Sequence, residues 1–299
     1  MLFRSDEVER ERGVITEEIR MMEDQPAAVA GEALNSILWP GQGIGRPIAG
    51  TMESVGSIPR QGLMDFWKRR IKGLRPVLVV AGGMPEKEAR ATAAKVLRGS
   101  GKVAPKKPVP AKRVKATELR VKAVAKPVQQ VNLAVGMYAF GRTDPRRHAL
   151  RIYSVILGEA MSSRLFQRLR EEEGLVYSVS SGAHLQADDG AFYISAGLEP
   201  GNVGIALGII AGEMRELATK GPGAAELKRA KDYATGQFAL GLEGTTQQMF
   251  WMGDSLVNRG RVVEPAETLE KYKAVDAKAV QAVARERSEE HTAELQSPC

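Results

Sequence analysis

The sequence contains little cysteine and little histidine, and each scarcity excludes a class of site. Cys299 is the single cysteine of the 299 residues, which excludes an internal disulfide and a cysteine-rich metal site. The three histidines are His148, His184 and His291. The longest apolar stretch, residues 203–211, is far shorter than the roughly 20 residues of a membrane-spanning helix. The N-terminal residues also lack the apolar core of a signal peptide, so we expect no membrane span.

What remains is the composition of an ordinary soluble globular protein. Hydrophobic residues make up 43% of the chain and charged residues 26%, which excludes a disordered tail protein and a collagen-like fibre. A chain of this length is sufficient for about two domains of roughly 150 residues each.

The positive charge is concentrated in one stretch of the chain. From Lys102 to Lys126, nine Lys and Arg residues stand against Glu118 alone, so this stretch carries +8 and the rest of a chain of net charge +7 sums to −1. Prolines within and next to the stretch block helices and sheet ladders, which predicts an extended basic linker over residues 101–127. Two interpretations stay open, a solvated linker and a surface for phosphate or a membrane. No aromatic residue is present to stack on bases, so we expect no nucleic-acid partner.

Both blocks that flank this linker mix helices with strands. In residues 1–100 we predict a helix over Ser5–Glu23 and a buried strand over Pro76–Ala81. In residues 128–286 we predict a strand over Val131–Phe140. The absence of regular βαβ alternation indicates an α+β fold in which helices pack on an antiparallel sheet. The other predicted elements are strands at Tyr177–Ser181 and Ala191–Ala196 and helices at 85–97, 148–169, 202–220, 224–242, 245–258 and 265–272.

Two carboxylates on the N-terminal helix are candidates for metal chemistry. Glu11 and Glu18 are seven residues apart in the sequence ERERGVITEEI, so two helical turns place them on one face. A carboxylate on a rigid helix is able to bind zinc, with a second carboxylate orienting the first or its partners. The alternative interpretation is a solvated acidic face.

An arginine and a tyrosine near the middle of the chain are candidates for substrate binding. In the sequence SSRLFQRLREEEGLVYSV, Arg170 precedes the predicted helix end at Gly174, and Tyr177 lies on the strand that follows. A guanidinium fork and a phenol hydroxyl together are able to hold a peptide carbonyl or stabilise an oxyanion. The alternative is an arginine paired with the neighbouring glutamates and a half-buried strand tyrosine.

These motifs occur in an order that resembles a known family of enzymes. The segments ERERGVITEEI, GRPIAGTMESVGSI and SSRLFQRLREEEGLVYSV follow one another along the chain. Their order and wording resemble the pitrilysin/insulinase zinc metallopeptidases, in particular the branch of mitochondrial processing peptidase and its bacterial relatives. The resemblance extends from Phe3 to about Glu286, since ELKRAKDYATGQFALGLEGTTQQM and AVDAKAVQAVARE resemble the late helices of that family.

The resemblance implies a fold, a metal and roles for the candidate residues. The family consists of tandem homologous α/β-roll domains, antiparallel sheets flanked by helices, and cleaves peptide bonds as zinc metalloendopeptidases. An H-x-x-E-H motif supplies two zinc ligands and the general base. By the match, Glu18 is the third zinc ligand and Glu11 its supporting carboxylate. Arg170 and Tyr177 match the pair that holds the substrate and stabilises the transition state.

The sequence departs from the family at the decisive motif. None of its three histidines belongs to an H-x-x-E-H, and only 17 residues precede Glu18, whereas the family places the motif roughly 70 to 80 residues before that glutamate. We therefore expect residues 1–100 to be the C-terminal part of the first, zinc-site domain and residues 128–286 to be the second domain. One carboxylate without histidines does not predict tight zinc binding. We expect the chain alone to be inactive, with His148 and His184 in structural or exposed positions.

The last residues do not fit the family's pattern. Residues 284–286 are expected to lead into a further strand, but RSEEHTAELQSPC is polar and has no strand pattern. We expect residues 287–299 to be a non-native tail that translates an adapter oligonucleotide, which makes the sequence a fragment truncated at both ends.

The sequence leaves two functions open within the family. The chain is a fragment of a zinc-dependent metalloendopeptidase or, alternatively, a non-catalytic subunit that holds the substrate of a heteromeric peptidase. A peptide or protein substrate and a homodimer or heterodimer are the expected partners. A soluble, cytoplasmic protein is expected, although the natural N-terminus, with any targeting signal, is expected to be missing.

Overall fold

The computed structural model of the chain describes residues 3–71, 73–74, 76–98, 101, 103, 109–114 and 119–292, with side chains to residue 288. These residues form two compact units, each assembled from segments that are distant in the sequence. Unit 1 consists of Met1–Asp24, Pro47–Val109 and Leu240–Val263, and unit 2 of Gln25–Arg46, Pro110–Ala239 and Glu264–Cys299.

Unit 1 is built from helices. The predicted N-terminal helix is confirmed as α1, which begins at Ser5 because Glu7 accepts a hydrogen bond from the backbone N–H of Arg4 at 3.3 Å. Val8 and Ile19 form its buried side. The other helical elements are α3 (Met52–Ser57), α4 (Arg60–Phe66), η2 (Trp67–Ile71), α5 (Glu86–Val96) and α9 (Thr245–Arg259).

The buried strand predicted at Pro76–Ala81 is wrong. The segment has no regular secondary structure, and Val77, Leu78 and Val80 are more than 40% exposed. Within the described part of unit 1, the single β-bridge is an isolated one between Leu74 and Val103. An apolar run becomes a buried strand only when a neighbouring strand accepts its backbone hydrogen bonds, and the described residues of unit 1 provide none.

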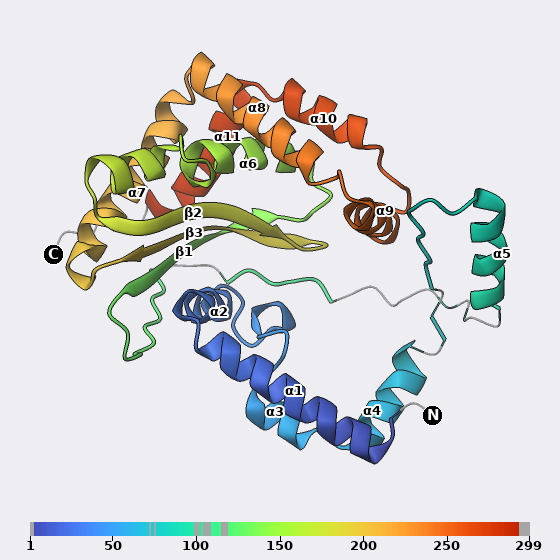
Figure 1. Cartoon of the computed structure of the whole chain (residues 1–299). Coiled ribbons are helices and arrows are strands. Elements are labelled where there is room, and N and C mark those ends of the chain that lie inside the picture. Colours follow the sequence, from blue (N-terminus) through green and yellow to red (C-terminus); the bar gives the residue numbers. More distant parts are fainter. Residues whose placement is uncertain are drawn as a thin grey trace. The chain divides into compact units, whose positions relative to one another are not determined.

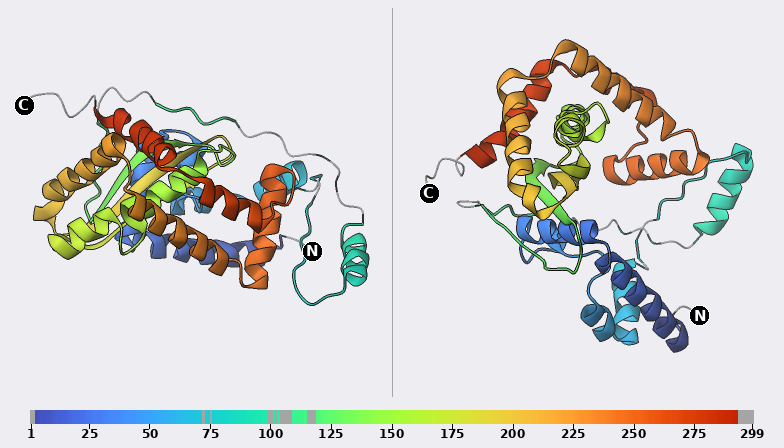
Figure 2. Two further views of the ribbon diagram at one scale, coloured as in Figure 1. Left: turned by 90° about the horizontal axis from the view of Figure 1, so that it is seen from above. Right: turned by 60° about the vertical axis from the view of Figure 1, so that its left-hand side comes forward.

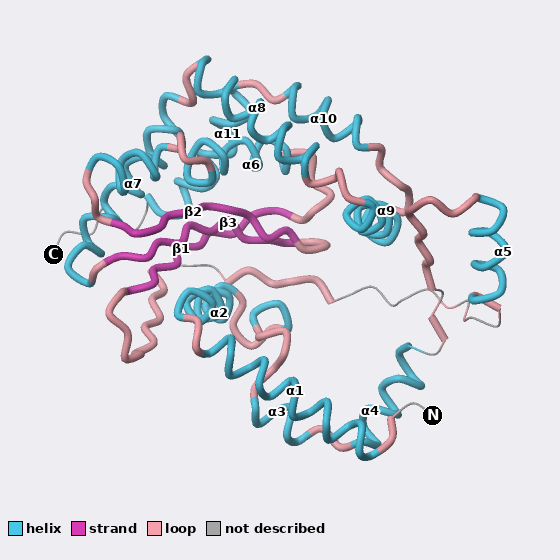
Figure 3. Tube along the Cα trace, in the orientation of Figure 1, coloured by secondary structure: helices cyan, strands magenta, loops and turns pink. Residues whose placement is uncertain are grey.

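Unit 2 contains an antiparallel sheet of three strands in the order β1-β3-β2 (Figure 3). The strands are β1 (Val131–Phe140), β2 (Val176–Leu185) and β3 (Asp189–Leu198). The sheet confirms the three strands that the sequence predicts, with longer bounds for the second and third. The central strand β3 pairs along its whole length with β1, from Val131 opposite Leu198 to Phe140 opposite Asp189.

Helices cover both faces of this sheet (Figure 1). On one face, α2 packs Leu34 and Leu38 against Tyr138 and Ala191. The other face carries the main core, in which Phe192, Ile194 and other fully buried side chains meet the remaining helices. Figure 2 shows α11 beside α7, in agreement with their extensive contact. The helices of unit 2 are α2 (Pro26–Leu38), α6 (Arg147–Ser154), α7 (Val203–Lys220), α8 (Ala224–Leu240), α10 (Pro265–Ala274) and α11 (Ala277–Thr292), with the short η1 (Gly43–Gly45) and η5 (Pro200–Asn202).

The prediction of a single helix over residues 148–169 is wrong, because the helical structure is interrupted. The chain forms α6, a π-helical turn η3 (Val155–Glu159), a break, and a second π-helical segment η4 (Phe166–Glu172). The break follows Ala160, whose backbone is extended at ψ 155°. Gly158 lies so close to Ser181 on β2 that a side chain there would be about 3 Å from it. Packing against the sheet therefore interrupts a helix that apolar periodicity alone predicts to be continuous.

The C-terminal helix continues into the segment predicted as a tail. Helix α11 extends to Thr292, and the guanidinium of Arg287 is buried beside Glu286. Ser288 donates a hydrogen bond to the carbonyl of Met214 at 3.3 Å. Residues 293–299, including Cys299, lie outside the described residues. Within the described ranges, no helix has the length and apolar character needed to cross a membrane.

The buried phenol of Tyr153 is expected to lower the stability of unit 2 at alkaline pH. The ring is fully buried beside Phe192, and its hydroxyl has no hydrogen-bond partner among the described residues. Burial therefore raises the pKa of Tyr153. Above pH 10 the unfolded phenol loses its proton while the folded one keeps it, so the free energy of unfolding falls with rising pH. We expect Tyr153→Phe to stabilise the fold by about 1 kcal/mol and to flatten this alkaline fall. Urea unfolding between pH 8 and 11 measures both effects, and a variant less stable than wild type at pH 8 would contradict them.

Candidate functional site

The two candidate carboxylates lie on α1 in unit 1. Glu11 and Glu18 are both exposed, whereas Val8 and Ile19 of the same helix are buried. Arg12 fixes the helix in place, because its guanidinium donates to the backbone carbonyl groups of Val55 and Ile58 at the end of α3. The helix thus holds both carboxylates on a rigid support and leaves them accessible.

The donor set of the chain does not fit a zinc ion. Among the residues that the structure describes, no group of three or more His, Cys, Asp and Glu side chains is arranged to hold a metal. Tetrahedral zinc sites need three or four such ligands, and Glu18 offers one. The described residues therefore do not form a zinc site by themselves.

The described histidines have structural surroundings. His148 is buried and packs edge-on against Tyr272 with 5.5 Å between ring centroids. His184 on β2 stacks on Tyr193 of the neighbouring strand at 4.9 Å. The side chain of His291 lies outside the described residues.

Arg170 and Tyr177 are both exposed in unit 2, on either side of the turn at Gly174. Gly174 has φ +61°, the left-handed conformation expected of a helix-ending glycine. The guanidinium of Arg170 lies over the ring of Phe166 at 5.1 Å, and the hydroxyl of Tyr177 donates to the carboxylate of Glu199 at 3.3 Å. No recorded contact in the described part of the chain joins Arg170 to Tyr177, so each presents its polar group to solvent separately.

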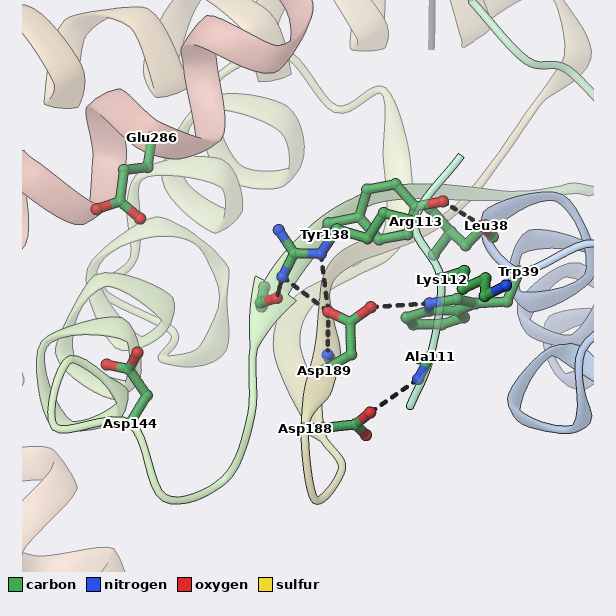
Figure 4. Close-up of polar contacts among 12 residues, drawn as sticks. Leu38, Trp39, Ala111, Lys112, Arg113, Tyr138, Asp144, Asp188, Asp189 and Glu286 are labelled. Atoms are coloured by element: carbon green, nitrogen blue, oxygen red, sulfur yellow. Dashed lines mark hydrogen bonds and ion pairs between the residues drawn. The ribbon is translucent and has the colours of Figure 1, made fainter. Parts of the chain in front are cut away.

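A polar network that the sequence does not reveal is centred on Asp189, at the start of β3 (Figure 4). Its carboxylate is buried and accepts hydrogen bonds from the indole N–H of Trp39 at 3.1 Å and from the guanidinium of Arg113 at 2.7 Å and 2.9 Å. Arg113 also donates to the carbonyl of Ala139 on β1. The network joins the end of α2, the basic segment and two strands.

Residues 109–114 and 119–127 of the basic linker form no helix or strand, and the contacts of Arg113 show that this part is not freely solvated. Next to Arg113, the backbone N–H of Ala111 donates to the carboxylate of Asp188 at 2.7 Å. Further along, Arg120 donates to the carbonyl of Ile37 and Lys122 to the hydroxyl of Ser36 at 2.9 Å. Asp188 and Asp189 precede a glycine, which in sequence indicates only a turn. Nothing in the sequence indicates that Asp189, the second of the two, is buried.

Two other charged clusters of unit 2 are structural. Arg146 binds both carboxylate oxygens of Glu286 on α11, at 2.8 Å and 2.9 Å. Arg146 also donates hydrogen bonds to Asp144, and these bonds hold the pKa of Asp144 below its usual range. Arg164 binds Glu226 of α8 at 2.7 Å, which raises the pKa of the guanidinium. Because these groups bond one another, they fix helices in place.

Comparison with known proteins identifies the family. Residues 57–233 match the family model described as the peptidase M16 inactive domain, and this span is more than half of the chain. The chain belongs to the M16 family of peptidases. This assignment confirms the resemblance to the pitrilysin/insulinase zinc metallopeptidases, and with it the family terms hydrolase, protease and metalloprotease.

Relatives and solved structures agree with this M16 assignment. An uncharacterized zinc protease of Mycobacterium leprae is 32% identical over 286 residues, which are 94% of this chain and 64% of that protein. The mitochondrial-processing peptidase subunit beta of Rattus norvegicus is 29% identical over 93% of this chain and 58% of its own length. The crystal structure of a Helicobacter pylori protease has a TM-score of 0.81 at 20% identity, covering 95% of this chain and 69% of that one. The chain thus shares the M16 fold and spans under two thirds of the length of these two relatives.

Proposed function

We propose that this chain is part of a zinc-dependent metalloendopeptidase to which it contributes one metal ligand and the residues that hold the substrate. The observation that supports the proposal is the match to zinc proteases over 94% of the chain, combined with a chain that offers Glu18 without histidine partners. In this proposal Glu18 is a zinc ligand, Glu11 supports it, and the histidine ligands belong to a part of the protein outside these 299 residues. The chain alone is then inactive.

Arg170 and Tyr177 would act on the substrate peptide. Both polar groups reach solvent, so a scissile carbonyl is able to approach them without displacing core side chains. A guanidinium and a phenol hydroxyl donate hydrogen bonds to the oxygen that gains negative charge during peptide hydrolysis. Because a phenol has a single donor proton, Tyr177 would exchange its present bond to Glu199 for a bond to the substrate oxygen.

A test of this role uses a chimera in which the chain replaces its aligned region of the Mycobacterium leprae zinc protease. Removing one donor to a developing oxyanion typically lowers kcat by about 10²- to 10³-fold. We expect Tyr177→Phe and Arg170→Ala each to lower kcat of peptide hydrolysis by about that factor, with a smaller effect on KM. Arg168→Ala is the matched control, because Arg168 lies on the same turn and pairs with Glu172 at 2.7 Å. Equal effects of the Arg168 and Arg170 variants would contradict the assignment.

A non-catalytic, substrate-holding subunit of a heteromeric peptidase is the second candidate. The matched family model is described as an inactive domain, and the rat relative is named as a subunit. In that case the chain pairs with a catalytic partner, and Glu11 and Glu18 have no metal to hold. Hydrolysis by the chimera that does not depend on Glu18 would favour this candidate.

A further inference from the structure

A β-bulge interrupts strand β2 at the position of Tyr177. Val176 pairs with Leu198 of β3, but the next pair in the register joins Ser178 to Gly197. Tyr177 has no partner of its own in this register, so two residues of β2 face one residue of β3, which is the arrangement of a bulge. The extra residue is the tyrosine to which the proposed function assigns a bond with the substrate.

The bulge changes the direction in which Tyr177 points. In a regular strand, residues two apart share one face of the sheet, so Tyr177 would face the core together with Val179. In β2 the buried residues Val176 and Val179 are three apart, and Tyr177 and Ser178 between them are both exposed. An extra residue in the strand accounts for this spacing. The bulge thus keeps both valines in the core while the phenol reaches solvent.

The short turn η5, which follows β3, holds the hydroxyl of this tyrosine. The carboxylate of Glu199 accepts the hydrogen bond from the Tyr177 hydroxyl at 3.3 Å, and Pro200 begins the turn directly after it. Asn202 closes the turn, because its backbone N–H donates to the carbonyl of Glu199 at 3.0 Å. Glu199 and Asn202 therefore belong to one hydrogen-bonded turn.

The same turn also holds the backbone that leads into the bulge. The side-chain amide of Asn202 donates to the carbonyl of Leu175 at 3.3 Å, and the N–H of Leu175 donates to the carbonyl of Leu169 on η4 at 2.8 Å. Leu175 is thus held from two sides, by η5 and by the helical segment that carries Arg170. This connection fixes the backbone of Arg170 and Tyr177 relative to each other, although no recorded contact within the described ranges joins the two side chains.

We propose that Glu199 and Asn202 are positioning residues, which together with the bulge hold the phenol of Tyr177 in the direction of the substrate oxygen. This inference rests on the proposed function, in which Tyr177 donates to that oxygen. Asn202 fixes the start of β2, and Glu199 accepts the hydrogen bond of the phenol until substrate binds. The ring is then already in place, so binding has less side-chain freedom to restrict.

The first test measures kcat and KM of peptide hydrolysis by the chimera with the Mycobacterium leprae protein. Asn202→Asp keeps the size of the side chain and a residue type that favours the start of α7, but it loses the N–H donor to Leu175. We expect kcat to fall about tenfold, because a small displacement of a reacting group is costly, and KM to change by less than about twofold. A residue that merely starts α7 would leave kcat unchanged in this variant.

The second test removes the acceptor of the phenol hydrogen bond. Glu199→Ala is expected to lower kcat about fivefold, the equivalent of one hydrogen bond, whereas Glu199→Gln keeps an acceptor oxygen and is expected to retain the kcat of the parent chimera. In the Tyr177→Phe background, which has no hydroxyl to position, Glu199→Ala is expected to have no further effect. Glu171→Ala removes another exposed carboxylate, from η4, and is the control, with unchanged kcat expected.

These variants separate the positioning role from the function on which it rests. An unchanged kcat of Tyr177→Phe would contradict the proposed function, and the positioning role with it. If Tyr177→Phe lowers kcat but Asn202→Asp and Glu199→Ala do not, the function stands and the positioning role is overturned. The same holds if the loss in Glu199→Ala persists in the Tyr177→Phe background.

A measurement without hydrolysis uses the 299-residue chain with 3-fluorotyrosine at position 177. Its fluorine resonance reports the surroundings of the ring. We expect the resonance to move toward that of the free amino acid in Asn202→Asp and Glu199→Ala, and to stay in place in Glu171→Ala. An unchanged resonance in the first two variants would overturn the inference even where Tyr177 proves essential for hydrolysis.

Discussion

Asp189→Ala is expected to lower the free energy of unfolding of unit 2 by about 3 kcal/mol, the lower end for breaking a buried charge pair. The carboxylate is 3% exposed and holds the indole N–H of Trp39, which is also 3% exposed, and the guanidinium of Arg113. Without it the indole N–H stays buried and unpaired, which is costly. The side chain of Arg113 is 43% exposed, so water compensates part of its loss.

The neighbouring residue provides the control for this prediction. Asp188 is exposed and accepts one hydrogen bond, from the backbone N–H of Ala111 at 2.7 Å. Asp188→Ala is expected to cost about 0.5 kcal/mol, as exposed substitutions usually do. Urea unfolding monitored by tryptophan fluorescence measures both variants. A cost for Asp189→Ala no larger than that for Asp188→Ala would show that the network does not stabilise unit 2.

Glu18→Gln is expected to have the largest effect on function. If Glu18 ligates zinc in the M16 chimera, its replacement by an amide removes a charged ligand. Mutation of residues that only hydrogen-bond to metal ligands already lowers metal affinity by about 10- to 100-fold. A loss of about 100-fold in zinc affinity, with a parallel loss of hydrolysis, is therefore expected. The fold is expected to be unaffected, because Glu18 is exposed on α1.

Glu17 is the matched control for Glu18. It is the preceding residue on the same helix, is 65% exposed, and forms an ion pair with Arg20. Glu17→Gln makes the same chemical change and loses one exposed ion pair, which contributes little to stability. Its zinc affinity is expected to equal that of the parent chimera.

The sequence predicts best those elements whose signal is local. The strands β1, β2 and β3 follow from short apolar or alternating runs bounded by turn residues, and α1 from acidic residues at its start. Pro76–Ala81 carries the same apolar signal but forms no strand, because a strand also needs a partner, which lies elsewhere in the chain. The path after Ser154 likewise depends on contact with β2, not on periodicity.

The candidate functional residues likewise differ in whether their sequence signal is local. Glu11, Glu18, Arg170 and Tyr177 are recognisable because their motifs are contiguous in sequence. The bond between Trp39 and Asp189 joins residues 150 positions apart, and the cavity beside β1 is lined by residues of α2, of α7 and of the segment 119–128. These features depend on which surfaces meet after folding, and a single sequence does not contain that information.

The most direct test of the proposed metal ligand is the zinc content of the chimera and of its Glu18→Gln and Glu17→Gln variants after dialysis against buffered zinc. We expect one zinc per molecule in the parent chimera and in the Glu17→Gln variant, and almost none in the Glu18→Gln variant at the same free zinc concentration. Stoichiometric zinc in the Glu18→Gln variant, with hydrolysis retained, would contradict the claim that this chain supplies a metal ligand to an M16 peptidase.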